Sequence, residues 1–465
     1  MSDAAPPAGA ASPGLTSSEL KRKLLHVAVG GFAFLLRFLT WPEAAALAIL
    51  AFLFNWQVLP RVGGRALWRG GDRERGYPLG ILLYPLSVLG LVLAFRGELW
   101  KAAAVWGVLA FGDGAASLLG QWLGGPRLPW NPRKGWIGFT SFVLFGSAGA
   151  SVLIAWTEAR PGALSPGVVL LAVALALLGA LVEALPTTLD DNVTVPLVLG
   201  AFVALVADVD VRSFMAEARV WQRGLLGLAA NVVIAAGAFL ARSIDRAGAL
   251  SAVVIGTTIT AGLGLPGLAL MIAFFVAGTL VTKLGYRVKA ARGIAQEKGG
   301  ARGWKNAWAN GGVPAFLALL AGAWASTAAS LPSPAGRSAW LFTLAYASSV
   351  ATAAADTCSS EIGKAYGRRT FLITTLRPVP PGTEGAVSLE GTLGGLAGAA
   401  LVALTGWAVG LLPPGVVPMV ALAGLVGSLA ESVVGTVAER RGWLDNDLLN
   451  ALNTAIGGAL GALIG

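Results

Sequence analysis

The sequence has 465 residues, of which 55% are hydrophobic and only 12% are charged, and its formal net charge is +10. A soluble domain normally carries about 25% charged residues, so the composition excludes an ordinary water-soluble protein and indicates a helical membrane protein. A single histidine and a single cysteine exclude a conventional zinc site and an intramolecular disulfide. Any bound metal is therefore expected to have oxygen ligands, which favours Mg²⁺ or Mn²⁺.

Residues 1–18 are rich in Ala, Pro and Ser, and this composition predicts a disordered tail. After the tail, apolar stretches follow one another and are separated by turn residues or charges. They predict an all-α polytopic membrane protein with about fifteen transmembrane helices in two bundles. The expected spans are residues 24–39, 44–60, 79–95, 101–123, 137–157, 167–185, 193–207, 223–241, 247–263, 265–282, 308–328, 339–354, 389–411, 416–437 and 447–464.

A polar stretch at residues 208–223 interrupts this series and predicts a boundary between two domains. We expect a first membrane domain at 19–210, a linker at 211–222 and a second membrane domain at 223–465. If the N-terminus is cytoplasmic, most of the 34 Lys and Arg residues fall on the cytoplasmic side, as the positive-inside rule requires. We therefore expect an integral protein of a bacterial inner membrane whose polar sites face the cytoplasm.

Polar side chains at the span ends of the first domain form one candidate site. An ionised group near hydrocarbon is costly unless it is paired, hydrated or bound to a cation, so it indicates function. Carboxylates together with a basic, glycine-containing loop indicate magnesium-dependent phosphoryl transfer, although no GxxxxGK[ST] motif is present. The candidates are Arg22, Lys23, His26, Asp113, Lys134, Glu183, Asp190, Asp191 and Asn192.

A second candidate set lies in the second domain, again at the ends of apolar segments. Two carboxylates there are surrounded by hydroxyl and amide side chains, and these oxygen-rich, sulphur-poor surroundings suit magnesium and phosphate. A Gly, Pro and Thr-rich loop follows the carboxylates in the sequence. The candidates are Lys283, Asn306, Asn310, Asp356, Glu361, Thr375, Thr383, Ser388 and Glu431.

Four motifs occur in order between residues 17 and 210, namely RKLLH, FGDGAASLLG, NPRKGWIGF and VEALPTTLDDNVTVPL. They resemble the polyprenol kinase family, which includes phytol kinase and dolichol kinase, and more distantly the phosphatidate cytidylyltransferases. The resemblance implies that CTP, with a divalent metal, phosphorylates a long-chain isoprenoid alcohol. The family's basic loop usually continues with a hydroxyl and a carboxylate, which are absent after Lys134. The implied site has Asp113 as catalytic residue, metal ligands at Glu183, Asp190 and Asp191, and nucleotide or phosphate contacts at Arg22, Lys23, His26, Lys134 and Asn192.

Three further motifs, GARGWKNAWANGGVPA, AADTCSSEIG and LITTLRPVPPGTEGAVSLEGT, resemble the phytyl-phosphate kinase family over residues 223–465. This resemblance implies phosphorylation of an isoprenyl monophosphate to the diphosphate. Glu431 stands where an aspartate is expected. The implied site has Asp356 and Glu361 as catalytic residues and metal ligands, with nucleotide or phosphate contacts at Lys283, Asn306, Asn310, Thr375, Thr383 and Ser388.

The two resemblances together predict a bifunctional kinase of prenyl-lipid or tocopherol metabolism. It would convert phytol, geranylgeraniol or a similar prenol to its diphosphate with CTP and Mg²⁺ (or Mn²⁺). Its partners would be the isoprenoid alcohol and its phosphate, the nucleotide and the bilayer, with no nucleic acid. Two alternatives remain open at this point. One is a cytidylyltransferase that forms a CDP-lipid, and the other is a transporter or flippase of phosphorylated lipids, because charges near the membrane midplane also mark transport paths.

Overall fold

The computed structural model describes residues 17–62, 68, 70–158, 164–296, 302–330, 335–438 and 444–465. The chain divides into two compact units, which we call unit 1 (Met1–Asp208) and unit 2 (Val209–Gly465). The predicted disordered tail lies outside the described residues except for its last two, which begin the first helix.

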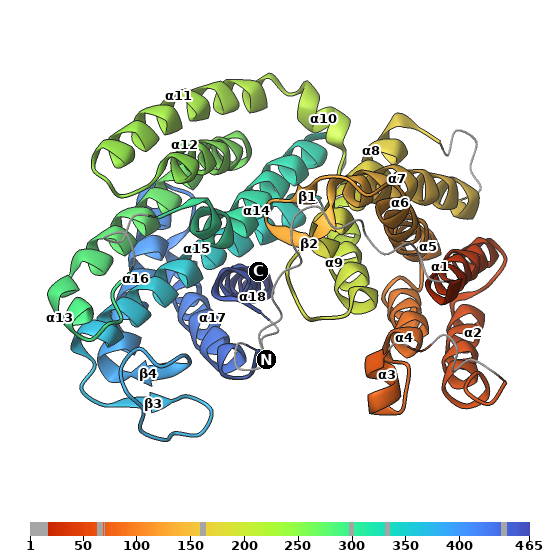
Figure 1. Cartoon of the computed structure of the whole chain (residues 1–465). Coiled ribbons are helices and arrows are strands. Elements are labelled where there is room, and N and C mark those ends of the chain that lie inside the picture. The colour runs from red at the N-terminus through yellow and green to blue at the C-terminus, as the bar shows by residue number, and fades with distance from the viewer. Residues whose placement is uncertain are drawn as a thin grey trace. The chain divides into compact units, whose positions relative to one another are not determined.

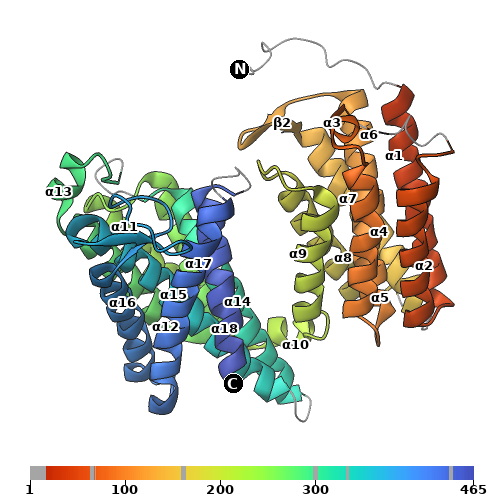
Figure 2. The ribbon, with the colours of Figure 1, turned by 90° about the horizontal axis from the view of Figure 1, so that it is seen from below.

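Unit 1 is a bundle of helices that run side by side, with a short two-stranded hairpin at one end (Figure 2). The antiparallel strands are β1 (Arg127–Leu128) and β2 (Asn131–Gly135). The helical elements are α1 (Ser17–Gly30), η1 (Gly31–Arg37), α2 (Trp41–Leu53), η2 (Phe54–Val58), α3 (Gly70–Arg75), α4 (Leu79–Ala94), α5 (Leu99–Gly107), η4 (Val108–Asp113), α6 (Gly114–Leu123), α7 (Trp136–Glu158), α8 (Pro166–Glu183) and α9 (Asp191–Val206).

Unit 2 is also helical, with one hairpin of antiparallel strands β3 (Thr370–Leu372) and β4 (Ala386–Ser388) (Figure 1). Its helical elements are α10 (Val211–Ala216), α11 (Ala218–Leu240), α12 (Arg246–Lys283), α13 (Tyr286–Ala291), α14 (Trp304–Ser330), α15 (Ala335–Tyr366), α16 (Leu389–Ala408), η6 (Pro414–Val416), α17 (Val417–Ala438) and α18 (Asn446–Ile464).

The helices match the hydropathy pattern of the sequence. Each expected span falls on helical residues over most of its length, and 247–263 and 265–282 are the two halves of α12. Gly264 separates these halves with φ +70°, a conformation that favours glycine, and Pro266 follows it. Within the described residues, nine helices are long and apolar enough to cross a membrane, and α4 and α9 are shorter apolar helices. The residues expected to form a linker, 211–222, are instead helical, because Asp210 caps α10 and Phe214 packs into a small core.

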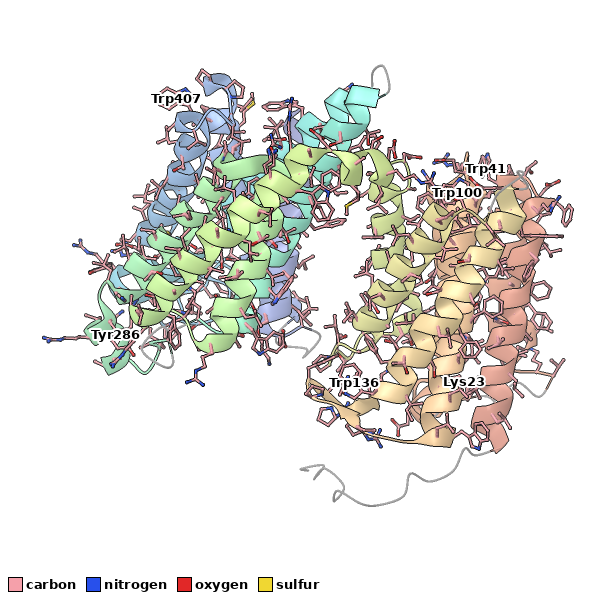
Figure 3. All side chains as sticks on the ribbon, turned by 90° about the horizontal axis from the view of Figure 1, so that it is seen from above. Lys23, Trp41, Trp100, Trp136, Tyr286 and Trp407 are labelled. Carbon is pink, nitrogen blue, oxygen red and sulfur yellow. The ribbon has the colours of Figure 1, made fainter. Side chains whose placement is uncertain are left out.

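The two ends of unit 1 differ in their polar groups. Figure 3 shows Lys23 and Trp136 at one end of the bundle and Trp41 and Trp100 at the other. Tryptophan favours the two membrane–water interfaces, so these residues mark the polar boundaries of the bundle. Between them lies one continuous apolar core built from all the main helices of the unit.

The core of unit 2 is organised around α15, which contacts α14, α16, α17 and α18. Small residues on α15 and glycines on its neighbours allow this close packing. A Cβ on Gly395 of α16 would lie 3.0 Å from the carbonyl oxygen of Ala355, and one on Gly424 of α17 would lie 2.9 Å from Ala351. Small residues at helix interfaces are the usual means of packing helices in a membrane. This packing sets the α15 segment that carries Asp356 among the surrounding helices.

Candidate functional site

Asp113 lies at the end of a π-helical turn, η4, between two glycines. Such turns are rare and often occur at functional sites. The glycines allow two helices to approach closely, because a Cβ on Gly112 would lie 2.9 Å from the ring of Phe142 on α7, and one on Gly114 would overlap Val27 of α1. The GDG sequence therefore brings α1 against the carboxylate.

Two side chains of α1, those of Lys23 and His26, lie beside the carboxylate of Asp113. The ammonium of Lys23 donates to both carboxylate oxygens, at 3.1 and 3.0 Å, and His26 Nε2 lies 3.5 Å from Oδ2. The side chains of Lys23 and Asp113 are only 12% and 13% exposed, so this charge pair is largely shielded from water. Arg22 belongs to the same helix, but its side chain is outside the described part of the structure.

The β1–β2 hairpin carries Lys134 to the carboxylates at the end of α8. The Lys134 ammonium donates to Glu183 at 2.6 Å and lies 3.8 Å from Asp191. Burial disfavours the charged form of Lys134, but these two carboxylates outweigh that effect and raise its pKa above the usual value. The side chain of Asn131 fixes the hairpin by donating to the carbonyl of Ala184 at 3.1 Å. Lys134 and Glu183 also lie within electrostatic range of Asp113, so the two polar clusters of unit 1 form one site.

Asp190 and Asn192 form the N-terminal cap of α9. Asp190 Oδ1 accepts hydrogen bonds from the backbone N–H of Asn192 at 3.0 Å and from its side-chain amide at 2.8 Å. Ser87 of α4 donates to the carbonyl of Asn192. Gly80 leaves space beside the cap, because a Cβ there would lie 3.4 Å from the other oxygen of Asp190. The cap therefore joins α4 to the site.

An apolar cavity of about 680 Å³ opens next to these polar residues. Its walls come from α1, η1, α2 and α4, and its polar lining includes Lys23, His26, Asp113 and Asn192. Tyr84 lines the cavity next to the polar residues. Its ring packs edge-on against His26, with the ring centroids 4.6 Å apart, and its hydroxyl accepts a hydrogen bond from Trp106 at 2.8 Å. The sequence carries no signal of this cavity, because apolar residues that face a cavity and apolar residues that face lipid have the same composition.

A second cavity, of about 210 Å³, is polar and lies in unit 2. Its lining comes from α14, α15, α16, α17, α18 and the loop between β3 and β4. Two predicted residues do not line it: Lys283 is exposed at the end of α12, and Thr375 is exposed in the turn after β3. The predicted residues that the cavity brings together are Asn306, Asn310, Asp356, Glu361, Thr383, Ser388 and Glu431.

The side chains of Asp356 on α15 and Glu431 on α17 both line this cavity and lie close enough to interact. Ser428, Ser432 and Asn450 lie in the same lining. Glutamate at position 431 is long enough to reach from α17 to α15, so the departure from the expected aspartate leaves the two carboxylates together. Within the described ranges, no group of three or more His, Cys, Asp or Glu side chains converges as a ready metal site.

Glu361 has a different partner from the one the sequence suggests. Its carboxylate accepts from Lys289 of α13, and both side chains are almost fully buried, at 2% and 1% exposed. Lys289 also donates to the carbonyls of Val281 and Thr282, at 3.2 and 2.8 Å. The three N–H donors of the Lys289 ammonium thus have three acceptors, and one of them is the carboxylate of Glu361. Lys289 lies in a basic stretch of the sequence, but nothing in that stretch indicates that this lysine points inward.

The hydroxyl and amide candidates of unit 2 are partly occupied by local bonds. Ser388 caps α16 by accepting from the backbone N–H of Gly391 at 3.0 Å. Asn310 donates to the carbonyl of Asn306 at 3.1 Å, and Thr383 donates to that of Pro380 at 2.8 Å. These bonds hold the cavity wall in shape while leaving lone pairs and amide protons at its surface.

The two sites differ in the charged groups that surround their carboxylates. Magnesium is usually held by one or two carboxylates together with substrate phosphates, and the Asp356–Glu431 pair among hydroxyl groups fits that donor set. In unit 1, Lys23 pairs with Asp113, and the single ammonium of Lys134 lies beside both Glu183 and Asp191. One lysine there faces two carboxylates, with Asp190 next to them in the chain, so the role of Glu183, Asp190 and Asp191 as metal ligands stays a prediction.

Residues 229–458 match the family described as Integral membrane protein DUF92. The chain is 43% identical over 208 residues to an uncharacterised membrane protein of Synechocystis, covering 44% of this chain and 77% of that protein. It is 36% identical over 231 residues to Protein VTE6, chloroplastic, of Arabidopsis thaliana (48% of this chain, 66% of that protein). It is 32% identical over 206 residues to Phytol kinase 1, chloroplastic, of the same plant (40% and 66%). No solved structure matches the chain.

One of these relatives is named as a phytol kinase, which agrees with the resemblance of the sequence motifs to polyprenol kinases. The cyanobacterial relative shares more than four tenths of its aligned residues with this chain and is covered over most of its length. The chain belongs to the family of Integral membrane protein DUF92.

Proposed function

We propose that this protein is a bifunctional lipid kinase, in which unit 1 phosphorylates an isoprenoid alcohol and unit 2 phosphorylates the resulting monophosphate. One observation carries the proposal: an apolar cavity of about 680 Å³ ends at a buried carboxylate, Asp113, that is paired with Lys23. A long hydrocarbon chain with a single hydroxyl has the shape and polarity of this cavity. The similarity to a phytol kinase supports the same substrate class.

In unit 1, the alcohol's hydroxyl lies against Asp113 and its chain lies between α1, α2 and α4. Asp113 accepts the hydroxyl proton while the oxygen attacks the terminal phosphorus of CTP. The bond from that phosphorus to the bridging oxygen breaks, and CDP leaves. Lys23 stabilises the charge near the attacking oxygen, and Lys134 approaches the transferred phosphoryl group. Positioning and charge stabilisation are the main protein contributions to phosphoryl transfer.

In unit 2, the monophosphate of the same lipid is the acceptor, and one of its oxygens attacks the terminal phosphorus of a second CTP. The bond from that phosphorus to the bridging oxygen breaks, and a second CDP leaves. The polar cavity and the motif similarity to phytyl-phosphate kinases support this assignment. Asp356 and Glu431 would hold a magnesium ion, which supplies neutralisation of phosphate charge when bound. Glu361 keeps the basic helix α13 in place through Lys289 and thereby positions the wall of the site.

The same proposal includes fifteen membrane crossings, a cytoplasmic N-terminus and both sites open to cytoplasmic nucleotide. The distribution of Lys and Arg residues along the sequence supports this topology. Unit 1 then makes the substrate of unit 2, so that a fused chain supplies both steps of prenol activation.

The test is to incubate membranes containing the protein with CTP and radiolabelled geranylgeraniol. We expect labelled monophosphate and diphosphate, with CDP as the nucleotide product. Pyrophosphate together with a CDP-lipid would instead identify a cytidylyltransferase. The absence of any phosphorylated prenol would reject the proposal.

A further inference from the structure

The backbone of Arg302 is held in place by two hydrogen bonds. Its N–H donates to the carbonyl of Ser243 at 3.0 Å, and its carbonyl accepts from the N–H of Asp245 at 3.2 Å. These bonds form a short bridge between Arg302 and the start of α12, just before α14 begins at Trp304. The side chain therefore starts from a fixed point at the edge of unit 2's polar cavity.

The guanidinium of Arg302 is held by apolar contacts. It lies over the ring of Phe274, 5.3 Å from the ring centroid, and against Gly278 of α12. A Cβ on Gly278 would overlap the guanidinium, so glycine at this position makes room for it. A cation over an aromatic face gains attraction without using its N–H donors. The donors thus stay available for other groups.

Arg302 lines the polar cavity together with Asp356 and Lys364. Glu361, a carboxylate of this wall that attracts the Arg302 guanidinium electrostatically, is already paired with Lys289. Among the residues that the structure describes, no ion pair and no side-chain hydrogen bond engages the guanidinium of Arg302. A partly buried guanidinium with unused donors in a polar cavity is suited to an anion with several oxygens.

We propose that Arg302 binds phosphate oxygens of the substrates of unit 2. This inference rests on the proposed function for the choice of phosphate as the anion. The planar guanidinium offers two parallel N–H donors that match two phosphate oxygens. The phosphate belongs either to the lipid monophosphate or to the nucleotide, and both present the same chemistry to the cavity.

The test measures binding to the purified full-length protein in detergent by isothermal titration calorimetry. The two probes are inorganic tripolyphosphate and geranylgeranyl monophosphate. We expect Arg302→Gln to weaken at least one of them about tenfold or more, which is the loss of a charge-assisted hydrogen bond. Arg287→Gln removes the same charge from an exposed position of α13 and is expected to leave both affinities unchanged.

Weaker binding of tripolyphosphate alone assigns Arg302 to the nucleotide, and weaker binding of the lipid phosphate alone assigns it to the acceptor. Loss of both assigns it to a phosphate position that the two share. If Arg302→Gln does not fold, Gly278→Ala decides, because its methyl group displaces the guanidinium without changing the net charge. Unchanged affinity for both probes in a folded variant overturns the inference. Arg302-dependent binding in a protein that transfers no phosphate would retain the inference and reject the proposed function.

Discussion

Replacing Lys289 with methionine gives a direct measure of the buried ion pair in unit 2. Lys289 and Glu361 are 1% and 2% exposed, and the ammonium also donates to two carbonyls at the end of α12. Lys289→Met leaves the Glu361 carboxylate buried without its ammonium partner, and among the described residues only a long hydrogen bond from Gln296, at 3.4 Å, remains. Removing one member of such a pair typically costs about 3–5 kcal/mol, because an uncompensated charge stays in a medium of low dielectric constant.

The double variant Lys289→Met/Glu361→Met separates this explanation from a simple loss of packing. Replacing both charges with apolar side chains removes the uncompensated charge, so we expect it to recover most of the lost stability. The exposed Lys283, six positions before Lys289, provides a matched control. Lys283→Met should change the free energy of unfolding by less than about 0.5 kcal/mol.

The assay is unfolding of the purified protein in mixed micelles, followed by circular dichroism. The reasoning is refuted if Lys289→Met unfolds like the wild type, or if the double variant is less stable than the single one. Either result would mean that Glu361 is not held by Lys289, and its assignment as a metal ligand would then regain weight.

Three further predictions concern the residues that line or border the sites. Ala51→Phe places a ring in the apolar cavity and should raise KM for a C20 alcohol about tenfold, with a smaller effect on shorter prenols. Ala46→Phe changes a residue of the same helix outside the cavity lining and should leave KM unchanged. Lys134→Gln should lower the melting temperature at neutral pH because it leaves the buried Glu183 unpaired. The pKa of Lys134 is higher in the folded protein than in the unfolded chain, where it is about 10.4. The ion pair therefore contributes its full stability below pH ~10.4 and loses it as the pH rises through the folded-state pKa. The melting temperatures of the variant and the wild type should converge at strongly alkaline pH. Thr375→Ala should leave diphosphate formation unchanged, since Thr375 is exposed outside the polar cavity.

Each of these three predictions has a contrary result. Equal effects of Ala51→Phe and Ala46→Phe on KM would remove the cavity from the alcohol's binding path. A melting-temperature difference for Lys134→Gln that stays constant up to strongly alkaline pH would contradict the ion pair. A loss of diphosphate with Thr375→Ala would place the turn after β3 at the reaction.

Hydropathy was sufficient to predict the long apolar helices, because membrane-length apolar segments have few alternatives to a helix in lipid. The break in α12 also has a local signal, since Gly264 precedes Pro266. The helical character of 211–222 had no such signal. Polar residues there look like a linker until Asp210 caps a helix and Phe214 finds a partner in the core.

The carboxylates of the candidate sites were predictable because charge near hydrocarbon is rare, whereas their partners were not. Lys283 and Lys289 belong to one basic segment, and the sequence does not distinguish them. The chain reverses at Gly285, which has φ +63°, and this turn directs Lys289 back toward Glu361 while Lys283 stays exposed. Arg302 ends the same basic stretch, and its inward direction is set by Phe274 and Gly278 on α12, which the sequence of the stretch does not reveal.

If one chain carries two consecutive phosphorylation sites, the labelled-prenol assay should give different products with Asp113→Asn and with Asp356→Asn. Both substitutions keep the size of the side chain and remove its charge. The account predicts that Asp113→Asn forms no monophosphate from geranylgeraniol but still converts added monophosphate to diphosphate. It predicts that Asp356→Asn accumulates monophosphate and forms no diphosphate. Identical product patterns from the two variants would contradict the assignment of separate steps to the two units.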